Sequence, residues 1–364
     1  MAGMPHAQLD YARRRDTLRA LLPDHDPSLD ALLVTNLDNV RYLSGFTGSN
    51  AGLLITADPA GDAIATDGRY LTQVAEQSGD LRAVIERDVA AALVAEVPGI
   101  VGFEATAMSY ADHARLAAQG ARLAPTTRLV ERLREVKDEG EIELLRTACA
   151  ISDRALAALV EEGAIRPGAT ESQVARRLEN LMYDFGAEAV AFETIVAAGA
   201  NSAIPHHRPT GAVLAAGDFV KIDFGARYAG YHADETRTFV LGEPADWQRE
   251  IYDLVRAAQA AGREALVPGA DVREIDGAAR SVIEAAGYGE QFLHGLGHGV
   301  GVEIHEAPTL GKLGSGTLSD GAVVTVEPGV YLPGRGGVRI EDTLVVRGDG
   351  PELLTRTTKD LIAL

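Results

Sequence analysis

The sequence predicts an α+β protein in two parts, an α/β domain followed by a larger domain of two similar halves. Its 364 residues exceed the usual size of a single domain. Short apolar strands alternate with helical patterns over roughly the first third of the chain, which is typical of an α/β domain. A helical stretch followed by an acidic hairpin then occurs twice, about 100 residues apart, which indicates an internal repeat.

The repeat is clearest in its acidic residues. In each copy a glycine precedes an acid by six positions, a second glycine follows, and another acid comes later. These residues are Gly217, Asp223, Gly225 and Asp234 in the first copy, and Gly321, Glu327, Gly329 and Glu341 in the second. Strand pairing brings the acids of one hairpin together, and two facing halves bring all four together. Clustered carboxylates repel one another, and a hard divalent cation between them is the usual remedy.

The composition excludes several classes of function. The 53 acidic and 34 basic residues give a net charge of −19, which argues against nucleic-acid or anionic-membrane partners. The single cysteine, Cys149, allows no internal disulfide, lies in an apolar helical pattern and fits a reducing compartment. No apolar run is long enough to span a bilayer. We therefore expect a cytoplasmic protein.

The first part should begin with a helix over 9–22 that ends at Pro23. Strands and helices then alternate, and the stretches 39–48 and 124–128 are predicted as a loop and as the exit from the domain. The predicted strands are 31–35, 53–56, 63–66, 84–86 and 100–104, and the predicted helices are 70–77, 89–97 and 108–119. Nothing in this part has the spacing of metal ligands. Arg41 and Arg69 are each interpreted first as ion-pair partners and second as clamps for a substrate carboxylate.

The second part should contain four long helices and two acidic hairpins. The predicted helices are 143–162, 171–185, 247–265 and 272–286, with a strand over 192–197 and a loop over 199–209. A glycine-rich stretch then carries His294, His298 and His305. Its glycines argue against a helical zinc motif and allow close backbone approach to a ligand. Imidazole together with four carboxylates suits a pair of manganese, cobalt, iron or zinc ions better than calcium.

Taken together, these motifs resemble the pita-bread metallopeptidases, and within them the Xaa-Pro peptidases, prolidase and aminopeptidase P. The resemblance covers essentially the whole chain, with matching blocks at 201–206, 223–238, 294–308, 327–329 and 339–341. It implies a creatinase-like N-terminal α/β domain over 1–132 and a pita-bread catalytic domain over 133–364. The pita-bread domain consists of two pseudo-symmetric α/β halves, which would be the repeat described above.

The resemblance also implies a role for each matching residue. The metal ligands would be Asp223, Asp234, His298, Glu327 and Glu341, with Asp234 and Glu341 bridging two ions. Glu327 would also shuttle a proton, and His206 and His305 would contact the substrate. Arg339 would brace Glu341, while His294 and Phe192 would belong to the substrate pocket. Glu235 stands where the family more often has an apolar residue, and strand alternation predicts that it points away from the metals.

The implied activity is that of an exopeptidase cutting the Xaa-Pro bond of short proline-containing peptides, and we favour an Xaa-Pro dipeptidase acting with manganese. An aminopeptidase P acting on longer peptides is the main alternative. A metal-independent creatinase-like hydrolase, a non-catalytic binding protein and a methionine aminopeptidase are more remote. A dipeptidase needs a cation for the proline carboxylate, and Arg41 is the first candidate. We expect a homodimer, the commonest assembly of soluble enzymes.

Overall fold

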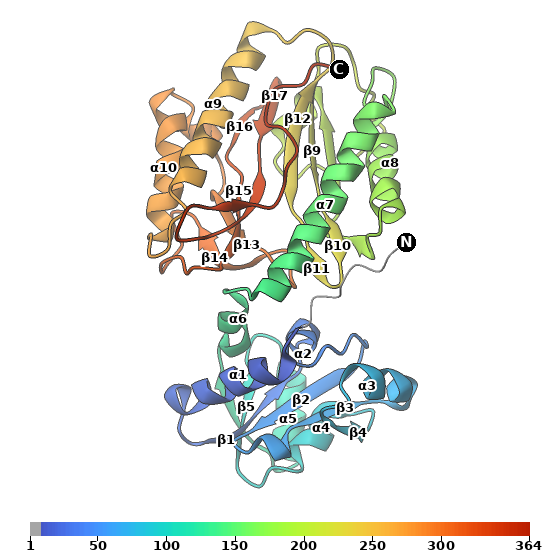
Figure 1. Cartoon of the computed structure of the whole chain (residues 1–364), viewed down its shortest axis with the longest axis vertical. Coiled ribbons are helices and arrows are strands. Elements are labelled where there is room, and N and C mark those ends of the chain that lie inside the picture. Colours follow the sequence, from blue (N-terminus) through green and yellow to red (C-terminus); the bar gives the residue numbers. More distant parts are fainter. Residues whose placement is uncertain (1–8) are drawn as a thin grey trace. The chain divides into compact units, whose positions relative to one another are not determined.

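The computed structural model describes residues 9–364 and divides them into two compact units (Figure 1). One unit ends at Arg134, and the other is Glu135–Leu364. Within these described residues, no helix has both the length and the apolar character needed to cross a membrane. The apolar cores of the two units are separate, so each unit is described by itself.

A six-stranded sheet in the order β4-β3-β2-β1-β5-β6 forms the centre of the first unit. Strand β1 pairs antiparallel with β2 and parallel with β5, so the sheet is mixed. The strands are β1 (Leu29–Val34), β2 (Ala51–Thr56), β3 (Ala63–Thr66), β4 (Arg82–Ile85), β5 (Ile100–Glu104) and β6 (Arg122–Thr126). The helices are α1 (Tyr11–His25), α2 (Leu37–Ser44), α3 (Leu71–Gln77), α4 (Val89–Val94), α5 (Tyr110–Ala118) and α6 (Leu129–Arg134).

Three segments of the first unit differ from the sequence prediction. The stretch 39–48 was expected as a loop, but it begins within helix α2. The side chain of Asn36 caps this helix, and Gly45 ends it in the left-handed conformation. The expected exit at 124–128 is instead the end of β6, before α6. Helix α1 continues through Pro23, because a proline in the last turn removes only one amide donor.

The second unit contains two helix pairs and several antiparallel sheets (Figure 1). Its helices are α7 (Glu139–Glu161), α8 (Glu171–Asp184), α9 (Asp246–Glu264) and α10 (Val272–Ala285). The strands of its first half are β7 (Ala189–Val190), β8 (Ile195–Ala198), β9 (Phe219–Phe224), β10 (Ala226–Tyr228), β11 (Tyr231–His232) and β12 (Glu235–Val240). Those of its second half are β13 (Gly297–Gly299), β14 (Glu306–Leu310), β15 (Val323–Val326), β16 (Gly329–Leu332), β17 (Gly336–Arg339), β18 (Asp342–Val345) and β19 (Glu352–Leu353).

Each half of the second unit buries its own apolar core. Helices α7 and α8 pack against β8, β9 and β12, with Leu156, Leu178 and Ile222 at the centre. Helices α9 and α10 pack against β15, β17 and β18, with Val255 and Val324 at the centre. Every helix lies on the outer side of the strands of its half (Figure 1). The strand faces that remain can therefore carry polar residues.

Hydrogen bonds from strand to strand join the two halves. The amide of Glu341 donates to the carbonyl of Thr236 at 3.1 Å. The hydroxyl of Thr343 donates to the carbonyl of Asp234 at 2.8 Å, and that of Thr238 to the carbonyl of Arg339 at 3.0 Å. The acid-bearing end of β12 is thereby fixed beside the acid-bearing end of β17.

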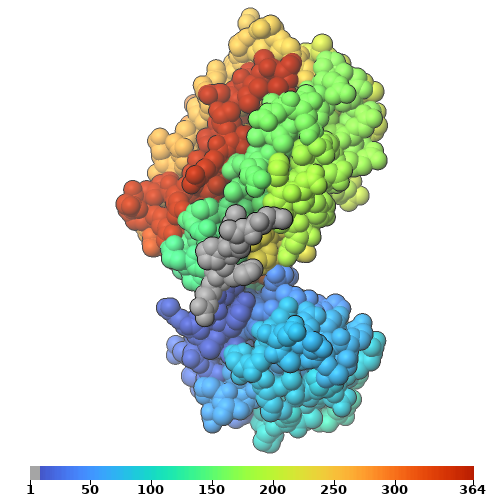
Figure 2. Space-filling view, turned by 45° about the vertical axis from the view of Figure 1, so that its right-hand side comes forward, coloured from blue at the N-terminus to red at the C-terminus, as the bar shows by residue number. Residues whose placement is uncertain are grey.

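The last residues of the chain cross the surface of the second unit beside α7, as the red and green surfaces in Figure 2 show. Asp153 of α7 anchors this segment. Its carboxylate accepts hydrogen bonds from the amides of Arg356 and Thr357, both at 2.9 Å, and from the Thr357 hydroxyl at 2.8 Å. A parallel bridge between Val240 and Ala363 then continues the sheet at β12.

Replacing Asp153 by alanine should loosen this segment, because three donors lose a charged acceptor. We expect the Asp153→Ala variant to lose about 2 kcal/mol of unfolding free energy, measured by urea unfolding. The control is Asp253→Ala on α9, since Asp253 is exposed and pairs with Arg256 alone in the described residues. Equal stabilities for the two variants would contradict the anchoring role.

Candidate metal centre and active site

A cavity of about 310 Å³ lies within the second unit, between the two halves. Strand ends from both halves form its floor, and the segment between β8 and β9 contributes one side. The lining residues are Phe192, Glu193, Ile195, His206, His207, Arg208, Asp223, Asp234, His298, Ile304, His305, Glu327 and Glu341. Five of them are the side chains predicted as metal ligands.

The acids reach the cavity because each lies in or next to the end of a strand. Asp223 is in β9 opposite Thr236 of β12, and Asp234 immediately precedes β12. Glu327 immediately follows β15, and Glu341 lies between β17 and β18. The repeated spacing in the sequence therefore corresponds to a repeated position in the fold.

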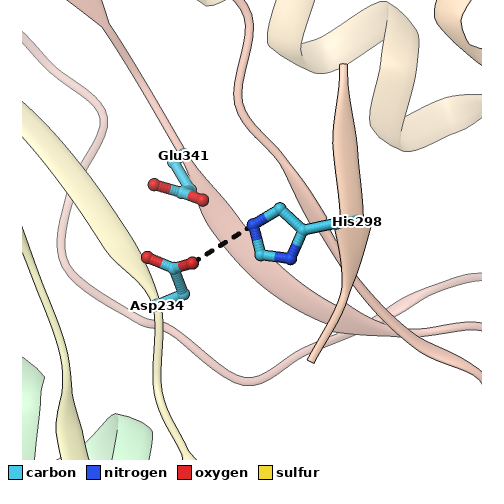
Figure 3. A group of neighbouring side chains, drawn as sticks. All are labelled: Asp234, His298 and Glu341. Carbon is cyan, nitrogen blue, oxygen red and sulfur yellow. Dashed lines mark ion pairs between the residues drawn. The ribbon is translucent and has the colours of Figure 1, made fainter. Parts of the chain in front are cut away.

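Asp234, His298 and Glu341 form the tightest group, with one donor atom from each lying within 4.8 Å of the others (Figure 3). The Nε2 atom of His298 is 3.4 Å from an oxygen of Asp234 and 3.4 Å from one of Glu327. Its Nδ1 atom donates to the carbonyl of Gly299 at 2.9 Å. This bond fixes the tautomer and leaves Nε2 facing the carboxylates, as in a metal-binding histidine.

Burial and mutual repulsion dominate the electrostatics of the group. Burial raises the pKa of Asp234, Glu327 and Glu341, and neighbouring acidic charges raise each pKa further. Burial alone would lower the pKa of His298, but hydrogen bonding to Asp234 and the charge of Glu327 raise it to about 9. The acidic groups of the cluster thus outnumber its positively charged groups.

These residues fit divalent metal ions. Carboxylates and an imidazole are the donors that borderline metals such as zinc and manganese accept. In addition, the Oδ1 atom of Asp223 is buried and has no hydrogen-bond donor in the described residues. A buried carboxylate oxygen without a partner is costly, and a cation would satisfy it.

Arg339 supports the acids from behind and has less than a twentieth of its surface exposed. Its Nη2 atom forms a short ion pair with Asp223. Its Nε atom donates to the hydroxyl of Thr236 at 3.0 Å, and this hydroxyl donates to Glu341 at 2.7 Å. Arg339 therefore contacts Asp223 directly and reaches Glu341 through Thr236.

Tyr331 connects Arg339 to His294. Its hydroxyl accepts a hydrogen bond from Arg339 at 2.9 Å and lies 2.8 Å from Nε2 of His294. Because Nδ1 of His294 donates to the carbonyl of Gly295, Nε2 is the acceptor. Burial and the nearby Arg339 charge lower the pKa of His294 to about 3, so this histidine is neutral. It lies behind the cavity rather than among its lining residues.

His305 and His206 line the cavity together with the acids. The rings of His298 and His305 meet edge to face, with centroids 4.5 Å apart. Burial lowers the pKa of His305, and the charge of the neighbouring His298 adds to this effect. A neutral imidazole at this position can accept or donate one hydrogen bond toward a ligand.

Apolar side chains form the remaining wall, and a surface ion pair lies beside it. Phe192, Ile195 and Ile304 provide the apolar surface. The exposed side chains of Glu193 and Arg208 pair at 3.1 Å. The cavity therefore combines a polar floor with an apolar side, an arrangement typical of small-ligand sites.

The two arginines considered as clamps both belong to the first unit. Arg69 forms a two-pronged ion pair with Asp67, with both N–O distances 2.8 Å, which agrees with the interpretation as an ion-pair partner. Arg41 lies on α2, and its role in substrate binding stays a prediction.

Sequence reasoning missed Tyr331, Thr236 and Lys221 in the network behind the acids. One of them had a signal in the sequence, because Thr236 lies two residues after Asp234, on the same face of the strand. The residue of the first copy that corresponds to Tyr331 is Arg227, so the repeat gave no signal for this tyrosine. For Lys221 the signal was only a charged residue inside an apolar strand.

Comparisons with known proteins agree with this geometry. Residues 143–348 match Metallopeptidase family M24, and residues 14–136 match the Creatinase/Prolidase N-terminal domain. The chain belongs to metallopeptidase family M24. The predicted fold class, a pita-bread domain preceded by a creatinase-like domain, is therefore confirmed, and so is the prediction of a metallopeptidase.

Several relatives of this M24 peptidase cover nearly its whole length. It is 35% identical to an Xaa-Pro dipeptidase of Pyrococcus horikoshii, over 92% of this chain and 95% of the relative. The structure of an Xaa-Pro dipeptidase from Bacillus anthracis is 38% identical, with a TM-score of 0.93, covering 98% of this chain and 100% of the other. An X-Pro aminopeptidase from Thermotoga maritima is 37% identical, with a TM-score of 0.87, covering 96% and 99%.

Removing metal from this M24 peptidase should lower its thermal stability, because the buried acids then repel one another. A divalent ion at 100 times its dissociation constant contributes about 3 kcal/mol. We expect chelator-treated protein to melt several degrees lower and to recover with Mn²⁺ or Zn²⁺, measured by differential scanning fluorimetry. The Asp234→Asn variant should respond less to added metal. An unchanged melting temperature on adding either ion would contradict the metal centre.

Glu235 points away from this cluster, into the interior of its own half. Its side chain is fully buried, and neither carboxylate oxygen has a hydrogen bond of good geometry within residues 9–364, although Arg237 lies 3.3 Å away and Thr357 is near. Burial raises its pKa to about 8. Arg237 keeps other partners, including Asp342 at 2.8 Å. The carboxyl group of Glu235 is therefore deeply buried with only weak polar contacts.

We expect Glu235→Met to stabilise the protein by about 1–2 kcal/mol, since an apolar group then replaces a poorly paired buried carboxyl. Urea unfolding measures this change, and the metal content should stay as in wild type. The control is Glu243→Met at an exposed position, which should change stability little. A less stable Glu235→Met variant would show that the carboxyl has a structural role.

Proposed function

We propose that this M24 metallopeptidase is an Xaa-Pro dipeptidase that hydrolyses the bond preceding proline in short peptides. The cavity is the observation that carries the proposal, because it joins the acid and histidine cluster to His206, His305 and an apolar wall. Small-ligand cavities span about 300–1,000 Å³, so one near the lower limit suits a dipeptide. The relatives named Xaa-Pro dipeptidase support the same activity.

The site is proposed to hold two divalent metal ions, manganese in the first instance. Asp223, Asp234, His298, Glu327 and Glu341 would be their ligands, as the mixed oxygen and nitrogen donor set suggests. Such ions lower the pKa of a bound water and polarise a substrate carbonyl. The repulsion among the buried acids is consistent with a resident cation.

The remaining side chains would then handle the proton and the substrate. Glu327 would accept a proton from the attacking water and deliver it to the leaving proline nitrogen, and burial raises its pKa toward that task. His206 and His305 would hydrogen-bond the scissile group. Arg339 would hold Asp223 in place. His294 would act only by supporting Tyr331.

Proline specificity follows from the bond itself. The proline nitrogen carries no hydrogen once acylated, so a site that relies on a substrate N–H cannot select it. The apolar side of the cavity, with Phe192 and Ile304, suits the proline ring. Arg41 is retained as the proposed contact for the free carboxylate.

The location, the assembly and the second candidate activity are proposed from composition and from comparison with similar enzymes. The net charge of −19 disfavours nucleic-acid partners, and the buried, unpaired thiol of Cys149 fits a reducing cytoplasm. A homodimer is the default assembly for enzymes of this kind. The likeness to the Thermotoga maritima X-Pro aminopeptidase favours aminopeptidase P activity on longer peptides as the second candidate.

Hydrolysis of Ala-Pro, Ala-Pro-Ala and Met-Ala-Ala by the manganese-loaded protein distinguishes these candidates. We expect cleavage of Ala-Pro alone, because the small cavity limits the length of the substrate. Cleavage of Ala-Pro-Ala as well would indicate an aminopeptidase P, and cleavage of Met-Ala-Ala a methionine aminopeptidase. The Glu327→Gln variant controls for contaminating peptidases. Inactivity on all three peptides with metal bound would overturn the proposal.

A further inference from the structure

Lys221 lies in the interior of the catalytic unit without a carboxylate partner among the described residues. It is in β9, two residues before Asp223, and its side chain is fully buried. Its ammonium donates to the backbone carbonyls of Ile204 at 2.6 Å and Pro205 at 3.1 Å, and lies 5.0 Å from the centre of the Tyr331 ring. Burying a lysine nitrogen costs free energy unless it is hydrogen-bonded. A lysine at this position therefore suggests a role for its hydrogen bonds.

The two carbonyls belong to the residues directly before His206. Arg339 also donates to the carbonyl of Pro205, at 3.2 Å. Because a peptide group is planar, fixing two consecutive carbonyls fixes the direction in which the chain enters His206. The cation that pairs with Asp223 thus shares an acceptor with Lys221.

The chain on either side of this point is also held. Before it, the hydroxyl of Ser202 accepts a hydrogen bond from the amide of Gly337 in β17 at 2.9 Å. After it, the ring of His207 lies 2.8 Å from the buried carboxylate of Glu171. The chain is therefore anchored at Ser202, four residues before His206, and at His207 directly after it, and the bonds from Lys221 hold the backbone at 204–205.

We propose that Lys221 is a positioning residue that holds the imidazole of His206 at its place in the cavity. This inference rests on the proposed function only in assigning His206 a contact with substrate. Lysine suits the task because one ammonium can donate to two carbonyls at once. Methionine has a similar length but no donor, so Lys221→Met would leave both carbonyls without this partner.

Replacing Lys221 should lower activity because His206 then loses its correct position. A displacement of about 1 Å in a catalytic group can lower the rate by as much as 100-fold. We therefore expect Lys221→Met to lower kcat/KM for Ala-Pro by about 10- to 100-fold, mainly through kcat, with the metal content unchanged.

A double-mutant cycle with His206→Ala tests the route of this effect. If Lys221 acts through His206, adding Lys221→Met to His206→Ala should change kcat/KM less than twofold. Independent effects that multiply in the double variant would overturn the proposal. Lys137→Met is the matched control, since Lys137 is also buried but pairs with Glu306 at 3.1 Å, and its effect should multiply with that of His206→Ala.

A second measurement does not depend on peptide hydrolysis. In zinc-loaded protein with labelled histidine, the His206 imidazole signal can be assigned by its disappearance in His206→Ala. It should shift in Lys221→Met and stay in place in Lys137→Met. An unmoved signal in Lys221→Met would overturn the proposal, whereas inactivity of the wild type on Ala-Pro would overturn only the proposed function.

A second variant covers the case in which Lys221→Met does not fold. Lys221→Gln keeps a hydrogen-bond donor and should fold with an intermediate loss of activity. The same coupling to His206→Ala is expected for it. If the losses of kcat/KM caused by Lys221→Gln and by His206→Ala multiply in the double variant, the positioning role is contradicted.

Discussion

The electrostatic repulsion among four buried acids is the constraint on which the catalytic unit depends. Asp223, Asp234, Glu327 and Glu341 meet in one small cavity. Burial and like charge raise the pKa of Asp234, Glu327 and Glu341 there. No single strand could hold them together, because residues on one face of a strand stand in a row. The fold solves the problem by bringing four strand ends from two halves to one place, and by putting helices on the outer faces only.

A network of polar side chains behind the acids holds them in fixed positions. Arg339 contacts Asp223, Thr236 and Tyr331, and Thr236 passes the connection to Glu341. The same arginine reaches the backbone before His206. Residues that would bind metal and residues that would bind substrate are therefore held by shared partners. Buried networks of this kind favour a single geometry when every polar atom has a partner, and the Oδ1 atom of Asp223 is the atom of this network described above as lacking a donor.

The sequence predicted the parts of the site that follow from local spacing. The repeated glycine and acid pattern anticipated four acids at strand ends, and the helices over 143–286 were located to within a few residues. The sequence did not predict which side chains pair through tertiary contacts. Arg339 was expected to brace Glu341 and reaches it through Thr236, but its ion pair with Asp223 was not anticipated. Lys221 gave no sign of its carbonyl contacts. The missed helix α2 depends on a cap by Asn36, a local signal that the aromatic and glycine residues around it obscured.

The division of the cluster between two halves has a consequence for how the protein matures. Asp223 and Asp234 belong to one copy of the repeat, while His298, Glu327 and Glu341 belong to the other. During synthesis the first pair leaves the ribosome long before the other three residues, and an isolated pair of acids binds metal weakly. The complete cluster therefore forms only when both halves have folded against each other. A chain that ends before the second hairpin lacks three of these five side chains and cannot assemble the cluster.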